Sequence, residues 1–282
     1  MFGSKTIEKL DQMLDEAMTG QFKESSYDES KLSRLESKWK QYLSASCLLK
    51  ENLEKEKESI KSLISDISHQ TKTPMTNIKM YAQLLEENME NGTVEFKRKL
   101  IQEIVRQTER LEFLIQSLTK LSRLETNVVE VKPVIQHISP LIEDVIRGIQ
   151  SKAEKKKIRI SGENVSTQKA FYDLKWTKEA LGNILDNAVK YSPSGSTVTI
   201  GITEYELYTD ICVKDCGIGI GEEEIPKIFG RFYRCEEVQQ EEGVGIGLFL
   251  AREIVRKQDG YIKVKSQKGE GTEFHVFLRK NS

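Results

Sequence analysis

The chain has 282 residues, of which 31% are charged and 38% are hydrophobic, and this length is enough for two domains with separate cores. Its formal net charge of -1 provides no basic surface for nucleic acid, and no apolar run is long enough to span a membrane. We expect a cytoplasmic chain whose only membrane attachment would be a segment upstream of it. The four cysteines have no metal-binding spacing and no histidine close in sequence, which argues against a zinc site.

Helical patterns dominate the first part of the chain. Apolar residues at helical spacing predict a helix over residues 4–19 and one or two longer helices over residues 30–90. A helical pattern of such length without caps is typical of a coiled coil. We therefore interpret residues 1–54 as a helical, coiled-coil linker.

The long helix carries His69 on its polar side. At about 100° per residue, His69 lies about 200° around the helix axis from Ile67. The apolar side consists of Ile60, Ile64, Ile67, Met75, Ile78, Ala82 and Leu85. Pro74 removes a backbone hydrogen bond and predicts a bend just after the histidine, which would expose the imidazole. By itself this pattern fits either a reactive histidine or an ordinary surface residue.

A second long helix is predicted from Phe96 to Leu121, after a break at residues 91–93. The two helices would form a hairpin with two long apolar stripes, and a hairpin cannot bury both stripes within itself. Dimerisation into a four-helix bundle would bury them, so we expect residues 55–128 to form a homodimer.

Short strands alternate with helices after about residue 130. Strands are predicted over residues 131–135, 158–161, 169–172, 197–203, 208–214, 261–265 and 272–278. Helices near residues 139–153, 175–190 and 247–258 should cover one face of the sheet. We therefore predict a multidomain α+β chain, in which a long helical hairpin is followed by an α/β sandwich domain over residues 129–282.

Polar and glycine-rich segments in this last domain suggest a nucleotide site. Asn183 and Asn187 lie four residues apart, so their side chains share one helix face. Asp215 ends a strand just before two glycines that let backbone approach a ligand closely. The glycine-rich run 243–247 opens a helix at Leu248, whose positive end and amides can bind phosphate. Alone, the two asparagines could belong to a solvated helix face, and the segment at Asp215 could be an ordinary turn.

In this order, the histidine and the downstream segments resemble the sensor histidine kinases of two-component signalling. In that family a phosphoacceptor-histidine segment is followed by an ATP-binding domain of the GHKL superfamily, and the likeness covers about residues 55–280. The resemblance implies a dimeric kinase that autophosphorylates His69 with ATP. It also implies transfer of the phosphoryl group to an aspartate on the receiver domain of a response regulator. Residues 1–54 would then carry the input signal.

The resemblance further implies which residues hold ATP and Mg²⁺. It assigns Mg²⁺ to the amide oxygen of Asn187 and the exocyclic amine of adenine to Asp215. Phe229 and Phe232 would anchor a mobile lid over ATP, although Phe229 could equally be a core residue, and Arg231 or Arg234 could neutralise phosphate charge. The nucleotide-binding candidates are Asn183, Asn187, Lys190, Tyr191, Asp215, Gly217, Gly219, Phe229, Arg231, Arg234, Gly243, Gly245, Gly247, Leu248 and Thr272.

Gln70 departs from the family pattern, which usually has Glu or Asp directly after the histidine. An amide can orient the ring, but it does not take a proton at neutral pH. We therefore expect either slower phosphorylation or a substitute base in Asp66, one helical turn back. Thr73 matches the position that orients water for dephosphorylating the response regulator, so a phosphatase activity is predicted as well.

Two other functions stay open at this point. GHKL domains also serve chaperone and DNA-repair ATPases, which would release free phosphate. A catalytically weak ATP-binding scaffold, or a phosphatase-biased kinase, would follow if Gln70 limits phosphorylation. An exposed His69 on a helical hairpin argues against the first, and the complete nucleotide segments argue against a scaffold. His137 and His275 fall outside these motifs and are interpreted as structural.

Overall fold

A computed structural model describes residues 31–125, 131–163, 168–238 and 243–281. The helix expected over residues 4–19 therefore lies outside the described residues. The chain divides into two compact units, Met1–Gln70 and Thr71–Ser282. Among the helices described, none combines the length and the apolar character that crossing a membrane would need.

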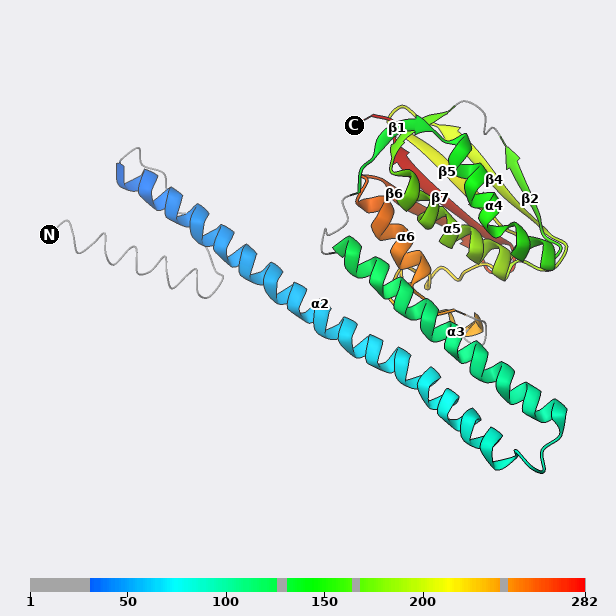
Figure 1. The fold of residues 1–282 in the computed structure, drawn as a ribbon. Helices are drawn as coiled ribbons and strands as arrows, with labels where there is room; N and C mark the ends of the chain where they lie inside the picture. Colours follow the sequence, from blue (N-terminus) through cyan, green and yellow to red (C-terminus); the bar gives the residue numbers. More distant parts are fainter. Residues whose placement is uncertain (1–30, 126–130, 164–167, 239–242, 282) are drawn as a thin grey trace. The chain divides into compact units, whose positions relative to one another are not determined.

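Two long helices come first in the described chain (Figure 1). Helix α2 spans Lys31–Glu87 and passes Pro74 without interruption, so the predicted pattern over residues 30–90 is one helix. Helix α3 spans Val94–Glu125. The hydroxyl Oγ1 of Thr93 accepts a hydrogen bond from the amide of Phe96 at 3.2 Å, which caps the first turn of α3. The predicted helical hairpin with its break at residues 91–93 is confirmed.

The apolar side of these helices is largely uncovered in a single chain. Ile60, Ile64 and Met75 on α2 are 52%, 59% and 59% exposed, and Ile115 on α3 is 55% exposed. Covering the exposed half of each such side chain would stabilise the protein by about 1 kcal/mol. So many exposed apolar side chains are unusual for a solvated helix face.

The rest of the described chain is a two-layer α/β domain. Its five-stranded sheet has the order β2-β4-β5-β7-β6, with β2 parallel to β4 and the other neighbours antiparallel. The strands are β2 (Arg159–Glu163), β4 (Thr197–Glu204), β5 (Tyr208–Lys214), β6 (Tyr261–Gln267) and β7 (Gly271–Arg279). Helices α4 (Ser139–Lys155), α5 (Leu174–Tyr191) and α6 (Gly247–Arg256) cover one face (Figure 1). The predicted α/β sandwich is confirmed.

Two strands stand apart from the main sheet. Strand β1 (Val134–His137) pairs antiparallel with β3 (Lys169–Tyr172) in a separate two-stranded sheet. The prediction of a strand over residues 131–135 was wrong in its bounds. Pro133 has no backbone N–H to donate to a ladder, so regular pairing begins only after it.

The core lies between the three helices and the inner face of the five-stranded sheet. On β5, Ile211 and Val213 are buried in this core, whereas Cys212 is half-buried and Lys214 is exposed. Successive side chains of a strand point to opposite faces. The outer face of the sheet therefore carries its own set of polar side chains.

Polar contacts fix the start of α5. Asp173 caps the helix by accepting a hydrogen bond from the amide of Trp176 at 3.1 Å. The buried Oε1 of Gln258, just after α6, accepts from the amide of Asp173 at 2.6 Å and from the hydroxyl of Thr177 at 3.1 Å. These bonds join α5 to the end of α6 and so set which face α5 presents to its surroundings.

Candidate nucleotide site and phosphoacceptor helix

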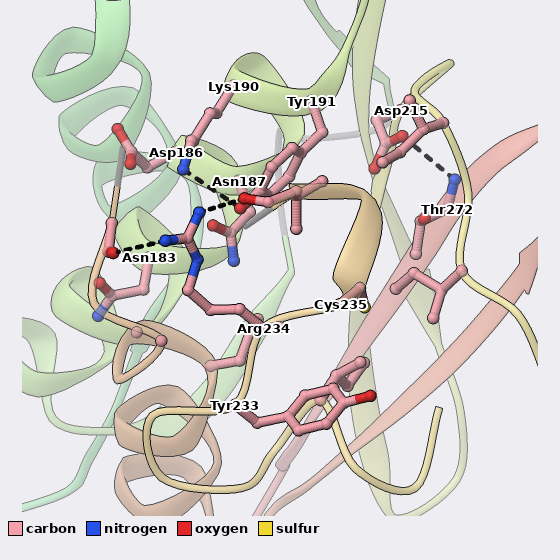
Figure 2. A pocket seen from close by; sticks show the side chains of 18 of the residues that line it. Asn183, Asp186, Asn187, Lys190, Tyr191, Asp215, Tyr233, Arg234, Cys235 and Thr272 are labelled. Carbon is pink, nitrogen blue, oxygen red and sulfur yellow. Dashed lines mark hydrogen bonds between the residues drawn. The ribbon is translucent and has the colours of Figure 1, made fainter. Parts of the chain in front are cut away.

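One pocket collects most of the nucleotide-binding candidates (Figure 2). They come from α5, from the end of β5, from the loop before α6 and from the start of α6 and β7. The candidates that line it are Asn183, Asn187, Lys190, Tyr191, Asp215, Gly219, Arg234, Gly243, Gly245, Gly247, Leu248 and Thr272. Segments about 90 residues apart in the chain therefore meet at one site.

Asp215 is a buried carboxylate, 6% exposed, in the wall of this pocket. Its Oδ1 accepts hydrogen bonds from the amide of Gly217 at 2.8 Å and from the amide of Thr272 at 3.2 Å. Burial raises the pKa of Asp215, and the two backbone hydrogen bonds act in the opposite direction. Neither bond uses Oδ2, so that oxygen remains available to a donor group of a ligand.

Two glycines of the pocket adopt backbone conformations that side chains rarely take. Gly219 has a φ of +68°, and a Cβ there would lie 2.0 Å from the carbonyl oxygen of Gln267. Gly245 has a φ of +77°, and its Cβ would lie 2.7 Å from the carbonyl oxygen of Tyr233. Both positions therefore require glycine, which explains the spacing of glycines in these segments.

Helix α6 begins in the pocket wall. Its N-cap residue, Ile246, makes no side-chain capping bond, so the cap provides no acceptor for the first-turn amides. A Cβ on Gly247 would lie 3.1 Å from Oδ1 of Asn183, so glycine lets α6 begin close to α5. Amides at the positive end of a helix are suited to phosphate oxygens.

Two cationic side chains line the pocket beside these amides. Lys190 donates a hydrogen bond to the hydroxyl of Tyr191 at 3.2 Å. Arg234 donates to the carbonyl oxygens of Val238 and of Gly243, the latter at 3.2 Å. Arg234 therefore already holds the loop that leads into α6, in addition to placing positive charge at the pocket.

The two cations of the pocket wall lie apart from Asp215, and Asp186 on their side is paired with Lys152. Figure 2 shows Lys190 and Arg234 on the side of Asn183 and Asn187, with Asp215 on the other side. A ligand with a phosphate end and an amine-bearing ring would meet a cation and an acceptor in matching places.

Three candidates are not among the residues described as lining the pocket. Gly217 instead donates its amide to Asp215. Phe229 is buried in the core, and its role in a lid stays a prediction. The guanidinium of Arg231 lies 4.8 Å from the ring centroid of Phe249. Of the two arginines considered for phosphate, Arg234 is therefore the one at the pocket.

Sequence reasoning missed the apolar wall of the pocket. This wall includes Ile218, Ile220, Ile228, Val238, Val244 and Phe274. A signal was available, because Ile218 and Ile220 alternate with glycines in a segment where polar loop residues would be expected. Asp186, Tyr233 and Cys235 also line the pocket without having been predicted. An apolar wall beside a carboxylate suits a flat heterocyclic ring.

His69 is exposed on α2, as expected. Asp66 and Gln70 are half-buried, and Thr73 is exposed. An exposed imidazole on a helix is open to another protein domain, which a buried structural histidine is not. Helix α2 thus exposes His69 and Thr73, the two residues for which reactions with a response regulator were predicted.

Two protein families match the chain. The family described as "His Kinase A (phospho-acceptor) domain" matches residues 59–127, and "Histidine kinase-, DNA gyrase B-, and HSP90-like ATPase" matches residues 172–282. Sensor protein SrrB of Staphylococcus aureus (strain N315) is 27% identical over 222 residues, which are 78% of this chain and 38% of SrrB. The chain thus spans well under half the length of this relative.

Solved structures share the fold. Histidine kinase AdeS of Acinetobacter baumannii has a TM-score of 0.58 at 19% identity, over 76% of this chain and 98% of its own. Histidine kinase ThkA, solved in complex with the response regulator TrrA, has a TM-score of 0.59 at 18% identity, over 80% and 64% of the two chains.

A phosphoacceptor helical hairpin followed by an ATPase-type α/β domain defines the class of two-component kinases, whose second domain binds ATP. The chain belongs to the sensor histidine kinase family.

Proposed function

We propose that this chain is the kinase portion of a two-component sensor, which autophosphorylates His69 with ATP and transfers the phosphoryl group to an aspartate of a response regulator. Its main support is the pocket in which the buried carboxylate of Asp215 and the first turn of α6 both form part of the wall. The carboxylate suits the amine of adenine, and the helix amides suit phosphate. ATP is therefore the phosphoryl donor, and the exposed His69 is the acceptor.

The residues of the pocket also fit a magnesium ion held together with the nucleotide. Mg²⁺ prefers oxygen ligands and usually needs few from the protein, because it keeps waters and phosphate oxygens. The amide oxygen of Asn187 would supply such a ligand, with Asn183 one helical turn away on the same face. When bound, the ion neutralises phosphate charge during transfer. Lys190 and Arg234 hold the phosphates in position from the same side.

Two protein partners belong to this proposal. The exposed apolar side of α2 and α3 supports a second copy of the chain, packed into a four-helix bundle. The complex of ThkA with TrrA supports a receiver domain as the second partner. In this scheme residues 1–54 relay the signal, residues 55–128 dimerise and carry His69, and residues 129–282 bind ATP.

Incubation of the purified chain with Mg²⁺ and γ-labelled ATP tests the proposal. We expect label on the protein that is stable in base and lost in acid, and that moves to an added receiver domain. Free phosphate without labelled protein would contradict the proposal and favour an ATPase of the chaperone or DNA-repair kind. Tight ATP binding with neither product would favour a scaffold.

Replacing Gln70 by glutamate is expected to raise the initial rate of His69 phosphorylation by roughly tenfold or more. A carboxylate after the histidine can accept the second ring proton, which the amide of Gln70 does not do. The measurement is the initial rate of labelling at saturating ATP. Asp66→Asn is the companion variant: it should slow the wild-type chain and spare the chain that already carries Gln70→Glu. An unchanged rate in Gln70→Glu would mean that another group takes the proton.

Replacing Thr73 by alanine is expected to slow dephosphorylation of the phosphorylated receiver domain by about 100-fold, because the water would lose the hydroxyl that orients it. Autophosphorylation of His69 should stay at the wild-type rate. Thr76→Ala is the matched control, since Thr76 is also an exposed threonine of α2. Equal phosphatase rates in the Thr73 and Thr76 variants would remove Thr73 from this role.

A further inference from the structure

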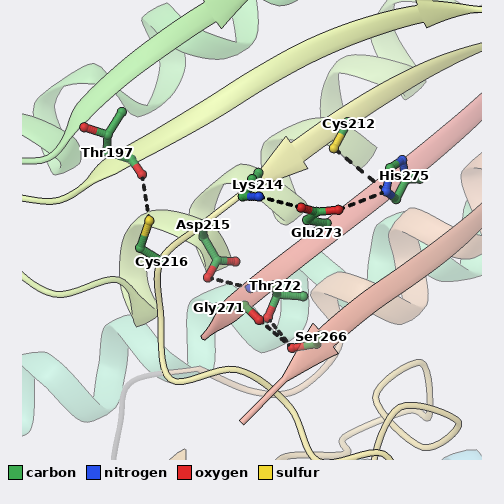
Figure 3. A network of polar contacts seen from close by, with 10 residues as sticks. All are labelled: Thr197, Cys212, Lys214, Asp215, Cys216, Ser266, Gly271, Thr272, Glu273 and His275. Atoms are coloured by element: carbon green, nitrogen blue, oxygen red, sulfur yellow. Dashed lines mark hydrogen bonds and ion pairs between the residues drawn. The ribbon is translucent and has the colours of Figure 1, made fainter. Parts of the chain in front are cut away.

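The outer face of the five-stranded sheet carries a cluster of three metal-binding side chains, away from the pocket (Figure 3). Cys212 on β5 lies directly opposite His275 on β7 in the strand register, and Glu273 precedes His275 by two residues on the same face. The Sγ of Cys212 lies 4.0 Å from Nε2 of His275, and Oε2 of Glu273 lies 3.6 Å from the same nitrogen. One atom from each residue lies within 4.8 Å of the other two.

The imidazole of His275 is oriented by Asp210, which contacts the ring nitrogen that does not face the cluster. Its Nδ1 lies 2.8 Å from Oδ2 of Asp210, which leaves Nε2 toward Cys212 and Glu273. Asp210 is 2% exposed, and its Oδ1 has no hydrogen-bond partner among the described residues. A buried carboxylate that accepts the second ring N–H is the usual support of a histidine that binds a metal.

The geometry points to a site for a divalent transition cation of the zinc class, bound by Cys212, Glu273 and His275. With metal bonds of 2.0–2.3 Å, a zinc tetrahedron has ligand-to-ligand distances of about 3.3–3.6 Å. The distances of 3.6 and 4.0 Å therefore need only small side-chain movements. Three protein ligands leave the fourth position to water. Binding forms a metal–sulfur bond and releases the thiol proton of Cys212 to solvent.

The surroundings leave room for the ion. Gly201 on β4 lies opposite Cys212, and a Cβ added to it would meet no atom within 4 Å. Lys214 binds the other carboxylate oxygen of Glu273, Oε1, at 2.7 Å and so leaves Oε2 to the site. On the neighbouring strand, Lys263 lies 5.5 Å from two aromatic ring centroids. Lys214 thus supports a ligand, while Lys265, opposite Glu273 in the register of β6 and β7, places one further positive charge near Cys212.

Sequence spacing gave no sign of this site and argued against zinc. Cys212 and His275 are 63 residues apart and meet only because β5 and β7 pair in register. The interpretation of His275 as merely structural gives way to that of a ligand. A bound ion would join these two strands at a point close to where each contributes to the nucleotide pocket, through Asp215 and Thr272 (Figure 3).

Titration of the nucleotide-free protein with Co²⁺ tests the site, because tetrahedral cobalt bound to a thiolate has a distinct charge-transfer absorption. We expect one equivalent of Co²⁺ to produce this absorption and an excess of Zn²⁺ to abolish it. Cys212→Ser should remove the absorption completely, while Cys47→Ser, which changes a thiol on α2, should retain it. Asp210→Asn should weaken Co²⁺ binding about 10–100-fold.

Nucleotide affinity serves as the check that each variant is folded, and Glu273→Gln offers a second ligand variant at a half-buried position. Weaker Co²⁺ binding in Glu273→Gln with unchanged nucleotide affinity would support the site. Two results would overturn it: no thiolate absorption in the folded wild-type protein, or an absorption that persists in Cys212→Ser.

Discussion

The His69→Ala chain is expected to take up no acid-labile label from γ-labelled ATP under conditions in which the wild-type chain is labelled. The reason is chemical: alanine has no nitrogen to attack the γ-phosphorus, and no other group can complete an in-line transfer at that point of α2. Nucleotide affinity should be unchanged, because His69 is not among the residues that line the pocket. The measurement is base-stable label per protein together with the dissociation constant of ATP.

His137→Ala is the matched control for the His69 variant. His137 is also an exposed histidine, but it lies on β1 and outside every motif. It should retain full labelling. Label that persists in His69→Ala and disappears in His137→Ala would move the phosphoacceptor to the second domain. Loss of both label and ATP binding in His69→Ala would point to a folding defect. In that case His69→Gln, which keeps a polar side chain of similar size, would be tested in its place.

The helices and strands could be predicted from local patterns, whereas most residues of the pocket were expected from the resemblance to sensor histidine kinases. Apolar spacing located α5 and α6 to within a few residues. Glycines mark backbone that other residues rarely adopt, as at Gly219 and Gly245, so their positions could be recognised without coordinates.

Features that depend on strand register or on side-chain direction could not be predicted in this way. The pairing of Cys212 with His275 follows from the register of β5 and β7, which no local pattern specifies. The choice between Arg231 and Arg234 at the pocket depends on side-chain direction within one loop. Arg231 lies against Phe249, whereas Arg234 lines the pocket. Sequence spacing does not separate these two arginines.

Replacing Asp215 by asparagine is expected to weaken ATP binding by about 100-fold, or roughly 2–3 kcal/mol. The amide oxygen of asparagine can still accept hydrogen bonds from Gly217 and Thr272, so the strand ends should keep their geometry. The nitrogen that replaces Oδ2 would face the adenine amine, and two donors repel. The measurement is ATP affinity by calorimetry, with Asp259→Asn as a control because Asp259 is an exposed aspartate away from the pocket.

The thermal stability of the Asp215→Asn chain distinguishes weaker ATP binding from unfolding of the variant. Burial raises the pKa of Asp215 in the folded chain above its unfolded value. The stability that this group contributes is therefore complete below the unfolded pKa and is lost as the pH rises through the folded pKa. At neutral pH the ionised carboxylate destabilises the nucleotide-free chain, so Asp215→Asn should unfold at a temperature no lower than that of the wild type.

The same pKa shift predicts how ATP binding depends on pH. The ligand needs the ionised carboxylate, so wild-type affinity should begin to fall, on acidification, at a pH above the usual range for aspartate. Asp215→Asn has no group to titrate there, and its weaker binding should lack this step. A wild-type profile without the step, or an Asp215→Asn chain that binds ATP as tightly as Asp259→Asn, would show that Asp215 does not hold the base.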